Sequence, residues 1–175
     1  MRSFEEMLDF PGIEAVVIST GAKFHAEQAT AAMERGLAVF VEKPLCATVA
    51  DALKLLEVQQ RTGAVVGLGH VDHANDAVSV TTKDLLTSGE LGEVVAFEKT
   101  TAHSGGFQIR PGDWRGDTKN NPGGMLFQCG VHGLHELAFY FGAVEEVYSV
   151  MRYDVHTTQT ADAAMCQFKI QSGLI

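Results

Sequence analysis

The chain has 175 residues, of which 46% are hydrophobic and 20% are charged, a composition typical of a globular protein and not of a disordered one. This length allows one domain or parts of two. The 13 Lys and Arg residues against 22 Asp and Glu give a net charge of −9, so phosphate would be repelled and we expect neither nucleic acid nor a membrane as a partner.

Export and disulfide signals are weak in the sequence. No stretch reaches the roughly 18–20 consecutive apolar residues that a membrane span needs, and the first six residues lack the apolar core of a signal peptide. We therefore expect a cytoplasmic location, with an upstream export signal as the alternative. Cys46, Cys129 and Cys166 lie far apart and form no CxxC pair, which argues against disulfides and against a cysteine zinc site.

The first 70 residues alternate short apolar strands with helices. The predicted strands cover 14–19, 37–41 and 64–68, and the predicted helices cover 25–35 and 48–61. Thr48 and Asp51 form a capping pair at the start of the second helix, and Gly63 ends it. Strands joined by helices of this length pair in parallel, and fully apolar strands suggest a sheet covered on both faces. Residues 1–70 are thus predicted to be part of a Rossmann-like, doubly wound α/β domain.

The rhythm changes after residue 70, where strands follow one another without intervening helices. The predicted helices cover 77–88 and 124–141, the predicted strands cover 94–103, 144–152 and 161–170, and a Gly-rich and Pro-rich loop covers 104–122. This order predicts a second α+β domain over residues 71–175 with a mainly antiparallel sheet. Because both sheets would keep open edges and exposed apolar faces, we expect an internal fragment of a longer chain.

Two strand ends carry polar residues where an open parallel sheet binds its ligands. Ser19 and Thr20 leave the first strand, and Glu42 and Lys43 leave the second. Pro44 forces Lys43 into an extended conformation and so fixes the direction of the chain. Lys43 could hold its charge against a ligand, or it could be an ordinary solvated surface lysine.

The helix predicted over 124–141 carries two stripes. Apolar residues at helical spacing form the first, namely Phe127, Val131, Leu134, Ala138 and Phe141. Gln128, His132 and His135 repeat at the same spacing one position further on, about 100° round the helix. This polar stripe could be a structural hydrogen-bond row, or it could face a substrate with a histidine as general base.

Two other kinds of site fit the sequence less well. A zinc site would draw on His132, His135 and Glu136, but His-x-x-His-Glu is not the His-Glu-x-x-His zincin pattern, so we predict no metal. The GxGxxG pattern that cradles a dinucleotide phosphate is absent from the 175 residues.

Five segments occur in one order and spacing that resembles a known family. They are Ile13–Thr20 (IEAVVIST), His25, Val41–Leu45 (VEKPL), Gly89–Val94 (GELGEV) and Gly123–His132 (GGMLFQCGVH). Together they resemble the Gfo/Idh/MocA family of NAD(P)-dependent oxidoreductases over almost the whole chain. The resemblance implies a Rossmann domain followed by a C-terminal α/β domain, with NAD or NADP as cofactor and a sugar or polyol as substrate.

The resemblance also implies roles for individual residues. Lys43 and His132 match the family's catalytic positions, with His132 taking the proton of the substrate hydroxyl. The residues that match cofactor contacts are Ser19, Thr20, His25, Glu42 and Lys43. The residues that match the substrate pocket are Trp114, Arg115, Gln128 and His135. The 175 residues alone are expected to be inactive, and the full-length protein is expected to form a homo-oligomer.

The sequence departs from the family pattern at positions that bear on the reaction. Gln128 and His135 stand where Asp is common, and an amide cannot accept a proton at neutral pH. The leading interpretation is a dehydrogenase that oxidises a sugar or polyol hydroxyl or reduces the ketone. The alternatives are an NAD-dependent glycosidase of the same fold, a non-catalytic regulator that senses a nucleotide or sugar, and, furthest from the pattern, a zinc hydrolase.

Overall fold

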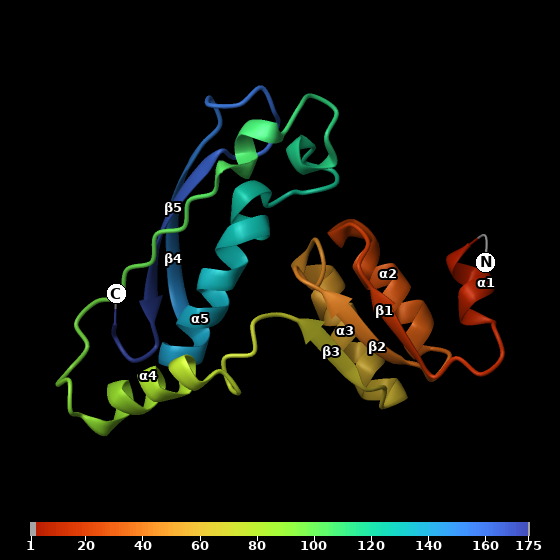
Figure 1. Ribbon diagram of the computed structural model, residues 1–175, viewed down its shortest axis with the longest axis horizontal. Helices are drawn as coiled ribbons and strands as arrows, with labels where there is room; N and C mark the ends of the chain where they lie inside the picture. Colours follow the sequence, from red (N-terminus) through yellow and green to blue (C-terminus); the bar gives the residue numbers. More distant parts are fainter. Residues whose placement is uncertain (1–2, 175) are drawn as a thin grey trace. The chain divides into compact units, whose positions relative to one another are not determined.

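A computed structural model of the chain describes residues 3–174, which form two compact units (Figure 1). The first unit holds the residues up to His70 together with Lys119–Pro122. The second holds Val71–Thr118 and the residues from Gly123 onward. Each unit has its own sheet and its own buried cluster.

The first unit is built on a parallel sheet with strand order β1-β2-β3. Its strands are β1 (Ala15–Ile18), β2 (Ala38–Glu42) and β3 (Val66–Gly69), and its helices are α1 (Phe4–Leu8), α2 (Ala22–Met33) and α3 (Val49–Thr62). In the register, Ile18 pairs with Val41 and Glu42 pairs with Gly69. The parallel α/β arrangement predicted from the sequence is confirmed.

Capping residues decide where the helices of this unit begin and end. Thr48 accepts a hydrogen bond from the Asp51 backbone N–H at 3.1 Å, and Gly63 ends α3 with φ of 68°, as predicted. Helix α2 begins at Ala22 and not at His25, because Gly21 already acts as its N-cap. The earlier start places His25 inside the first turns of the helix.

Only one face of the parallel sheet is covered within the described residues. Val16, Ile18, Val39 and Val41 turn inward against α2 and α3, whereas Val17 is 73% exposed on the opposite face. The expectation of a sheet covered on both faces is wrong for this part of the chain. Right-handed crossovers along the order β1-β2-β3 place both connecting helices on the same side.

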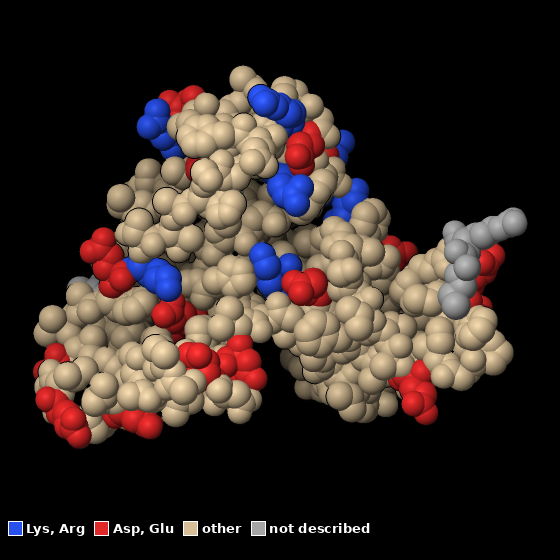
Figure 2. Space-filling model, viewed as in Figure 1, with Lys and Arg blue, Asp and Glu red and all other residues tan. Residues whose placement is uncertain are grey.

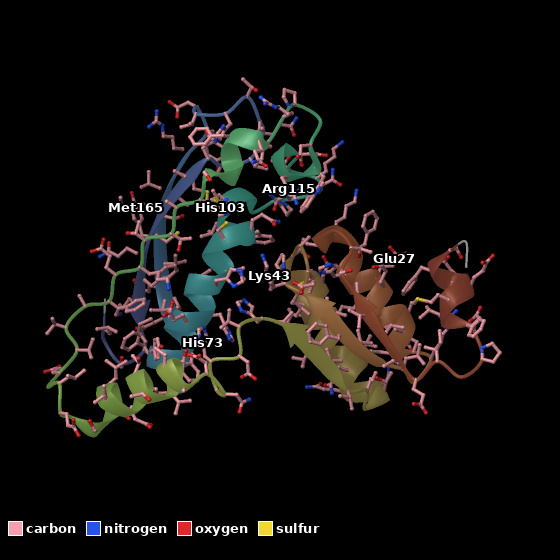
Figure 3. The ribbon with its side chains drawn as sticks, viewed as in Figure 1. Glu27, Lys43, His73, His103, Arg115 and Met165 are labelled. Carbon is pink, nitrogen blue, oxygen red and sulfur yellow. The ribbon has the colours of Figure 1, made fainter. Side chains whose placement is uncertain are left out.

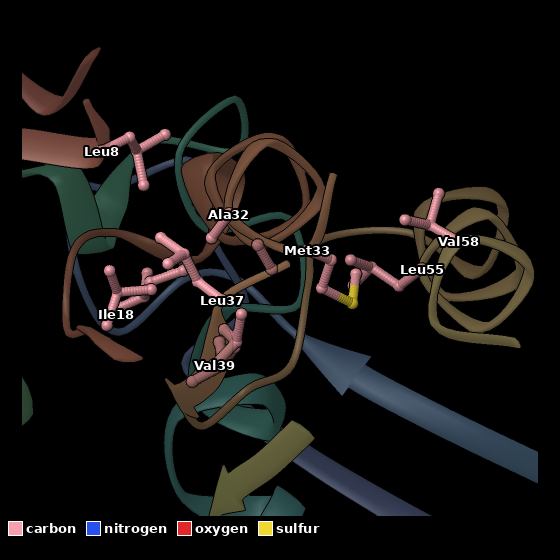
Figure 4. Packing of buried hydrophobic residues seen from close by; sticks show 11 residues of the cluster. Leu8, Ile18, Ala32, Met33, Leu37, Val39, Leu55 and Val58 are labelled. Carbon is pink, nitrogen blue, oxygen red and sulfur yellow. The ribbon is translucent and has the colours of Figure 1, made fainter. Parts of the chain in front are cut away.

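The covered face holds the larger hydrophobic core (Figure 4). Met33 of α2 is 1% exposed and lies between the sheet and the side chains of Leu55 and Val58 on α3. Leu8 of α1 joins the same cluster. The polar residues at the ends of these strands are therefore supported by a sheet that two helices pack against on one face.

The second unit contains an antiparallel pair, β4 (Val144–Arg152) and β5 (Ala163–Ile170), with a register shift between Val144 and Glu146. The predicted antiparallel sheet is confirmed, and Gly173, with φ of 94°, lies in the turn that follows β5. Helix α4 (Ala77–Ser88) also forms as predicted. Acidic side chains gather at the lower left of Figure 2, where Figure 1 draws α4.

The strand predicted over 94–103 does not form, since this segment takes neither helix nor strand. Its apolar residues are used for packing instead. Val94 and Phe97 pack against the small cluster of Leu137, Ile170 and Leu174, with the Phe97 and Phe141 rings 5.2 Å apart. An apolar alternation reports burial on one side but does not supply a partner strand for the backbone.

The predicted helix over 124–141 is two segments in succession. A π-helical turn covers Leu126–Gly130 and continues into α5 (Val131–Phe141). The buried residue of α5 is Leu137, whereas Ala138 of the predicted apolar stripe is exposed. The π-turn shifts the residues before Val131 relative to those of α5, and Ala138 is exposed within α5 itself, so the prediction of one continuous apolar stripe is wrong.

Candidate functional site

The carboxyl edge of the parallel sheet gathers the first group of predicted site residues. Ser19 and Thr20 follow β1 and are exposed, while the half-buried Lys43 follows β2 (Figure 3). The pairing of Ile18 with Val41 brings these two loops side by side. The Lys43–Pro44 peptide bond is cis.

Glu42 is held at the end of β2 by two features. Its Oε2 accepts a hydrogen bond from the backbone N–H of Lys43 at 3.1 Å. Its partner across the ladder is Gly69, where an added Cβ would lie only 3.0 Å from Glu42 Oε1. A residue without a side chain at position 69 therefore leaves room for the carboxylate, a relation that sequence reasoning missed.

His25 lies beneath the two loops and is 1% exposed. Its Nδ1 is 2.9 Å from the carbonyl oxygen of Pro44, and its Nε2 is 2.9 Å from the carbonyl oxygen of Thr20. The structure thus brings His25 together with Ser19, Thr20 and Lys43 at one edge. A direct contact between His25 and a cofactor stays a prediction.

Neighbouring residues complete the surroundings of these loops. The Thr20 hydroxyl donates to Gln28 Oε1 at 2.6 Å, which ties the loop to α2. Cys46 donates from its thiol to the carbonyl of Thr48 at 3.3 Å. Burial raises the pKa of this thiol, and the carboxylate of Asp51 raises it further, which disfavours the thiolate.

The second unit holds the predicted substrate residues Trp114 and Arg115 on a short 3-10 turn, Trp114–Gly116. The Arg115 guanidinium lies 4.4 Å from the centre of the Trp114 ring, a cation–π contact. Asp113 accepts the Arg115 backbone N–H at 2.9 Å, and the Arg115 carbonyl accepts the Thr160 hydroxyl at 3.2 Å. These contacts hold the two side chains as one group.

Gln128 and His132 lie on either side of the junction between the π-helical turn and α5, and both are half-buried. An added Cβ at Gly130 would lie 2.5 Å from Leu126 Cδ1, so the turn packs tightly around this glycine. His132 Nδ1 is buried from solvent. Single π-turns inside α-helices occur frequently at functional sites.

His135 belongs to a cluster that sequence reasoning did not find. Its Nε2 is 3.1 Å from the Val71 carbonyl, and its ring stacks on that of His73 at 5.1 Å. His73 Nδ1 lies 2.8 Å from the hydroxyl of the buried Ser79. The structural alternative for the polar stripe therefore has direct support at His135, and its contact with a substrate stays a prediction.

The N-cap of α4 completes this cluster. Asp76 accepts the backbone N–H of Ser79 at 2.7 Å. Hydrogen bonds from the Ser79 hydroxyl and backbone lower the pKa of Asp76, and the nearby His73 lowers it further. The pattern Asp76-x-x-Ser79 was the signal in the sequence that could have revealed the connection.

Three further observations concern residues 3–174 only. In that range no group of three His, Cys, Asp or Glu side chains is placed to hold a metal ion. Nor does any helix there have the length and apolar character needed to cross a membrane. A shallow hollow on α4 contains none of the predicted site residues and is lined by Ala77, Val78, Thr81 and Thr82.

Comparisons with known proteins match both parts of the chain. The family described as "Oxidoreductase family, NAD-binding Rossmann fold" matches residues 1–70, and the "GFO/IDH/MocA C-terminal domain" matches residues 79–175. The chain is 28% identical to 1,5-anhydro-D-fructose reductase of Ensifer adhaerens over 177 residues, covering 100% of this chain and 52% of that protein.

Two more relatives support the same assignment. Identity to scyllo-inositol 2-dehydrogenase (NAD(+)) of Bacillus subtilis is 28% over 83% of this chain and 40% of that protein. A solved inositol dehydrogenase homologue from Azotobacter vinelandii, in complex with NADH and myo-inositol, superposes with a TM-score of 0.83 at 26% identity, covering 98% of this chain and 45% of that one. The chain thus spans about half the length of these relatives. It belongs to the Gfo/Idh/MocA family of oxidoreductases.

Proposed function

We propose that this chain contributes the catalytic residues of an NAD(P)-dependent dehydrogenase that acts on a sugar or polyol hydroxyl, or on the matching ketone. The observation that carries the proposal is the group at the carboxyl edge of the parallel sheet, where Thr20 and Lys43 lie in adjacent loops tied together by His25. The names of the relatives, which concern anhydrofructose and inositols, support the substrate class.

The residues present fit one end of a dinucleotide. Hydroxyl groups at Ser19 and Thr20, the carboxylate of Glu42 and the amine of Lys43 lie at one sheet edge, which suits the polar groups of the nicotinamide and its ribose. The 175 residues do not supply the glycine-rich loop that binds the pyrophosphate, because they contain no GxGxxG. When bound, the nicotinamide accepts or supplies the hydride.

Two side chains carry the chemistry of the protein in this proposal. His132 takes the proton of the reacting hydroxyl at Nε2, since its Nδ1 is buried. Lys43 stabilises negative charge that develops on the substrate in the transition state. Gln128 is restricted to orienting a hydroxyl, because an amide cannot accept a proton at neutral pH. Trp114 and Arg115 shape the substrate side, with the guanidinium already positioned on the indole ring.

The test uses the protein expressed from the longest open reading frame that contains this chain. Binding of NAD(H) and NADP(H) is measured by calorimetry, and turnover is followed through the absorbance of the reduced nicotinamide on a panel of polyols and sugars. His132→Ala is expected to lower kcat by about 10²–10⁴-fold. His103→Asn, at an exposed histidine outside the proposed site, is the matched control.

Each other outcome points to a different function. Release of free sugar without net reduction of the cofactor would assign an NAD-dependent glycosidase. Binding of NAD(P) without turnover on any substrate would assign a sensing role, which is consistent with Gln128, whose amide cannot accept a proton. Parental turnover in folded His132→Ala would remove His132 from the reaction.

A further inference from the structure

One buried histidine contacts both loops of the proposed cofactor edge. His25 lies in the first turns of α2 and is among the most deeply buried side chains of the chain, with 1% exposure. Each ring nitrogen approaches one backbone carbonyl at 2.9 Å, that of Pro44 at Nδ1 and that of Thr20 at Nε2. A buried polar ring of this kind is kept in place by its hydrogen bonds, because leaving them unmade is costly.

In both contacts the histidine ring must be the hydrogen-bond donor. A carbonyl oxygen only accepts, so each contact is a hydrogen bond when the nitrogen facing it carries a proton. A neutral ring has one N–H and can donate to one carbonyl at a time, whereas a doubly protonated ring donates to both. In either state the donor nitrogen points at a loop and not at α2 itself.

The two carbonyls belong to the loops that carry the predicted cofactor contacts. Thr20 directly follows Ser19 at the end of β1, and Pro44 directly follows Lys43 at the end of β2. The strands β1 and β2 are neighbours in the sheet, so one ring spans the gap between their loops from below. Thr20 has a further tie to α2 through Gln28, whereas the Pro44 carbonyl is held by His25.

We infer that His25 is a positioning residue, which fixes Lys43 and Thr20 relative to each other by hydrogen bonds to the two loops, in place of the direct cofactor contact that the family resemblance implies. This inference rests on the proposed function for its effect on turnover. It differs from a purely structural role because the geometry at Lys43 depends on a particular ring nitrogen. A displacement of about 1 Å in an active site can cost on the order of 10²-fold in rate.

Three substitutions separate the two hydrogen bonds from simple packing. His25→Leu keeps apolar volume and removes both ring nitrogens, and with them every hydrogen bond from position 25 to the two loops. His25→Asn places an amide nitrogen at the position of Nδ1, facing Pro44, whereas His25→Gln places it near the position of Nε2, facing Thr20. Glu27→Gln changes an exposed residue two positions along the same helix and serves as the control (Figure 3).

The variants are made in the protein expressed from the longest reading frame that contains this chain, and each is first shown to be folded by thermal unfolding. His25→Leu is expected to lower kcat/KM by about 10–100-fold. His25→Asn is expected to restore more of kcat than His25→Gln, because it retains the bond beside Lys43. Parental kcat and KM in folded His25→Leu would overturn the inference, as would Asn and Gln variants no better than Leu.

A second measurement does not depend on the proposed function. Amide hydrogen exchange at residues 19–22 and at residues 43, 45 and 46 is expected to speed up in His25→Leu, while exchange in α4 stays unchanged. Unchanged exchange in both loops would overturn the positioning role even in an active enzyme. If the parent protein binds no NAD(P) but His25→Leu still exchanges faster than the parent in both loops, the proposed function is refuted and the positioning of the two loops by His25 stands.

Discussion

The two units differ in how they bury their apolar side chains. In the first, eleven buried residues from α1, α2, α3 and the sheet form one cluster. In the second, the described residues provide three, Leu137, Ile170 and Leu174, and all nine residues of β4 are exposed. The proposed cofactor edge therefore stands on a well-packed support, whereas the helix that carries His132 rests on a small one.

This contrast predicts that the two units respond separately to core substitutions. Met33→Ala removes a side chain that is 1% exposed and is expected to destabilise the first unit by about 2–5 kcal/mol. Trp114, the only tryptophan, lies in the second unit, so the denaturant transition followed by its fluorescence should stay in place. Circular dichroism and amide exchange in α2 would report the loss. An equal shift of both transitions would show that the units unfold as one.

The reciprocal substitution lies in the smaller cluster. Leu137→Ala is expected to cost about 2 kcal/mol, at the lower end for this change, because its half-buried neighbours can relax into the space. The Trp114 fluorescence transition should shift, while exchange in α2 should not. A cost as large as that of Met33→Ala would indicate that more of the protein covers this cluster than residues 3–174 contain.

Helix caps provide a smaller test of the first unit. Thr48→Ala removes the side-chain acceptor for the Asp51 N–H and is expected to cost about 1 kcal/mol. Thr48→Ser keeps the hydroxyl and should cost much less. Urea unfolding followed by circular dichroism measures both variants. Equal costs would mean that the methyl group, and not the hydrogen bond, stabilises the start of α3.

The cap at Thr48 also shows what the sequence alone could predict. Caps, glycine stops and apolar runs are local signals, so α3, α4 and the parallel strands were predictable within a few residues. The segment 94–103 was not, because a strand needs a partner backbone that the local pattern does not report. The π-turn at Leu126–Gly130 and the two contacts of His25 depend likewise on tertiary packing.

The cap of α4 is expected to give the second unit a stability that depends on pH. Hydrogen bonds from Ser79 lower the pKa of Asp76 below its ordinary value of 3.8, so the folded state favours the carboxylate. The stabilisation is present above that value and is lost as the pH falls through the lowered pKa. Asp76→Asn should keep the helix cap but make the free energy of unfolding depend less on pH in the acidic range. The measurement is urea unfolding at several acidic pH values, followed by Trp114 fluorescence. An unchanged profile would show that Asp76 contributes nothing to it.

The smallest expected effect lies on the open face of the parallel sheet, where two adjacent valines differ only in direction. Val16 is 5% exposed in the core, and Val17 is 73% exposed on the other face. Val16→Thr buries a hydroxyl and should cost about 1–3 kcal/mol, whereas Val17→Thr should change stability by less than about 0.5 kcal/mol. Urea unfolding of the two variants measures the effect of burial on each face of the sheet, because the substitution and the strand are the same in both. The comparison is made in the protein expressed from the longest reading frame. If Val17→Thr lowers the free energy of unfolding as much as Val16→Thr does, the face that carries Val17 is packed against residues outside this chain, and the two faces of the sheet do not differ in burial in that protein.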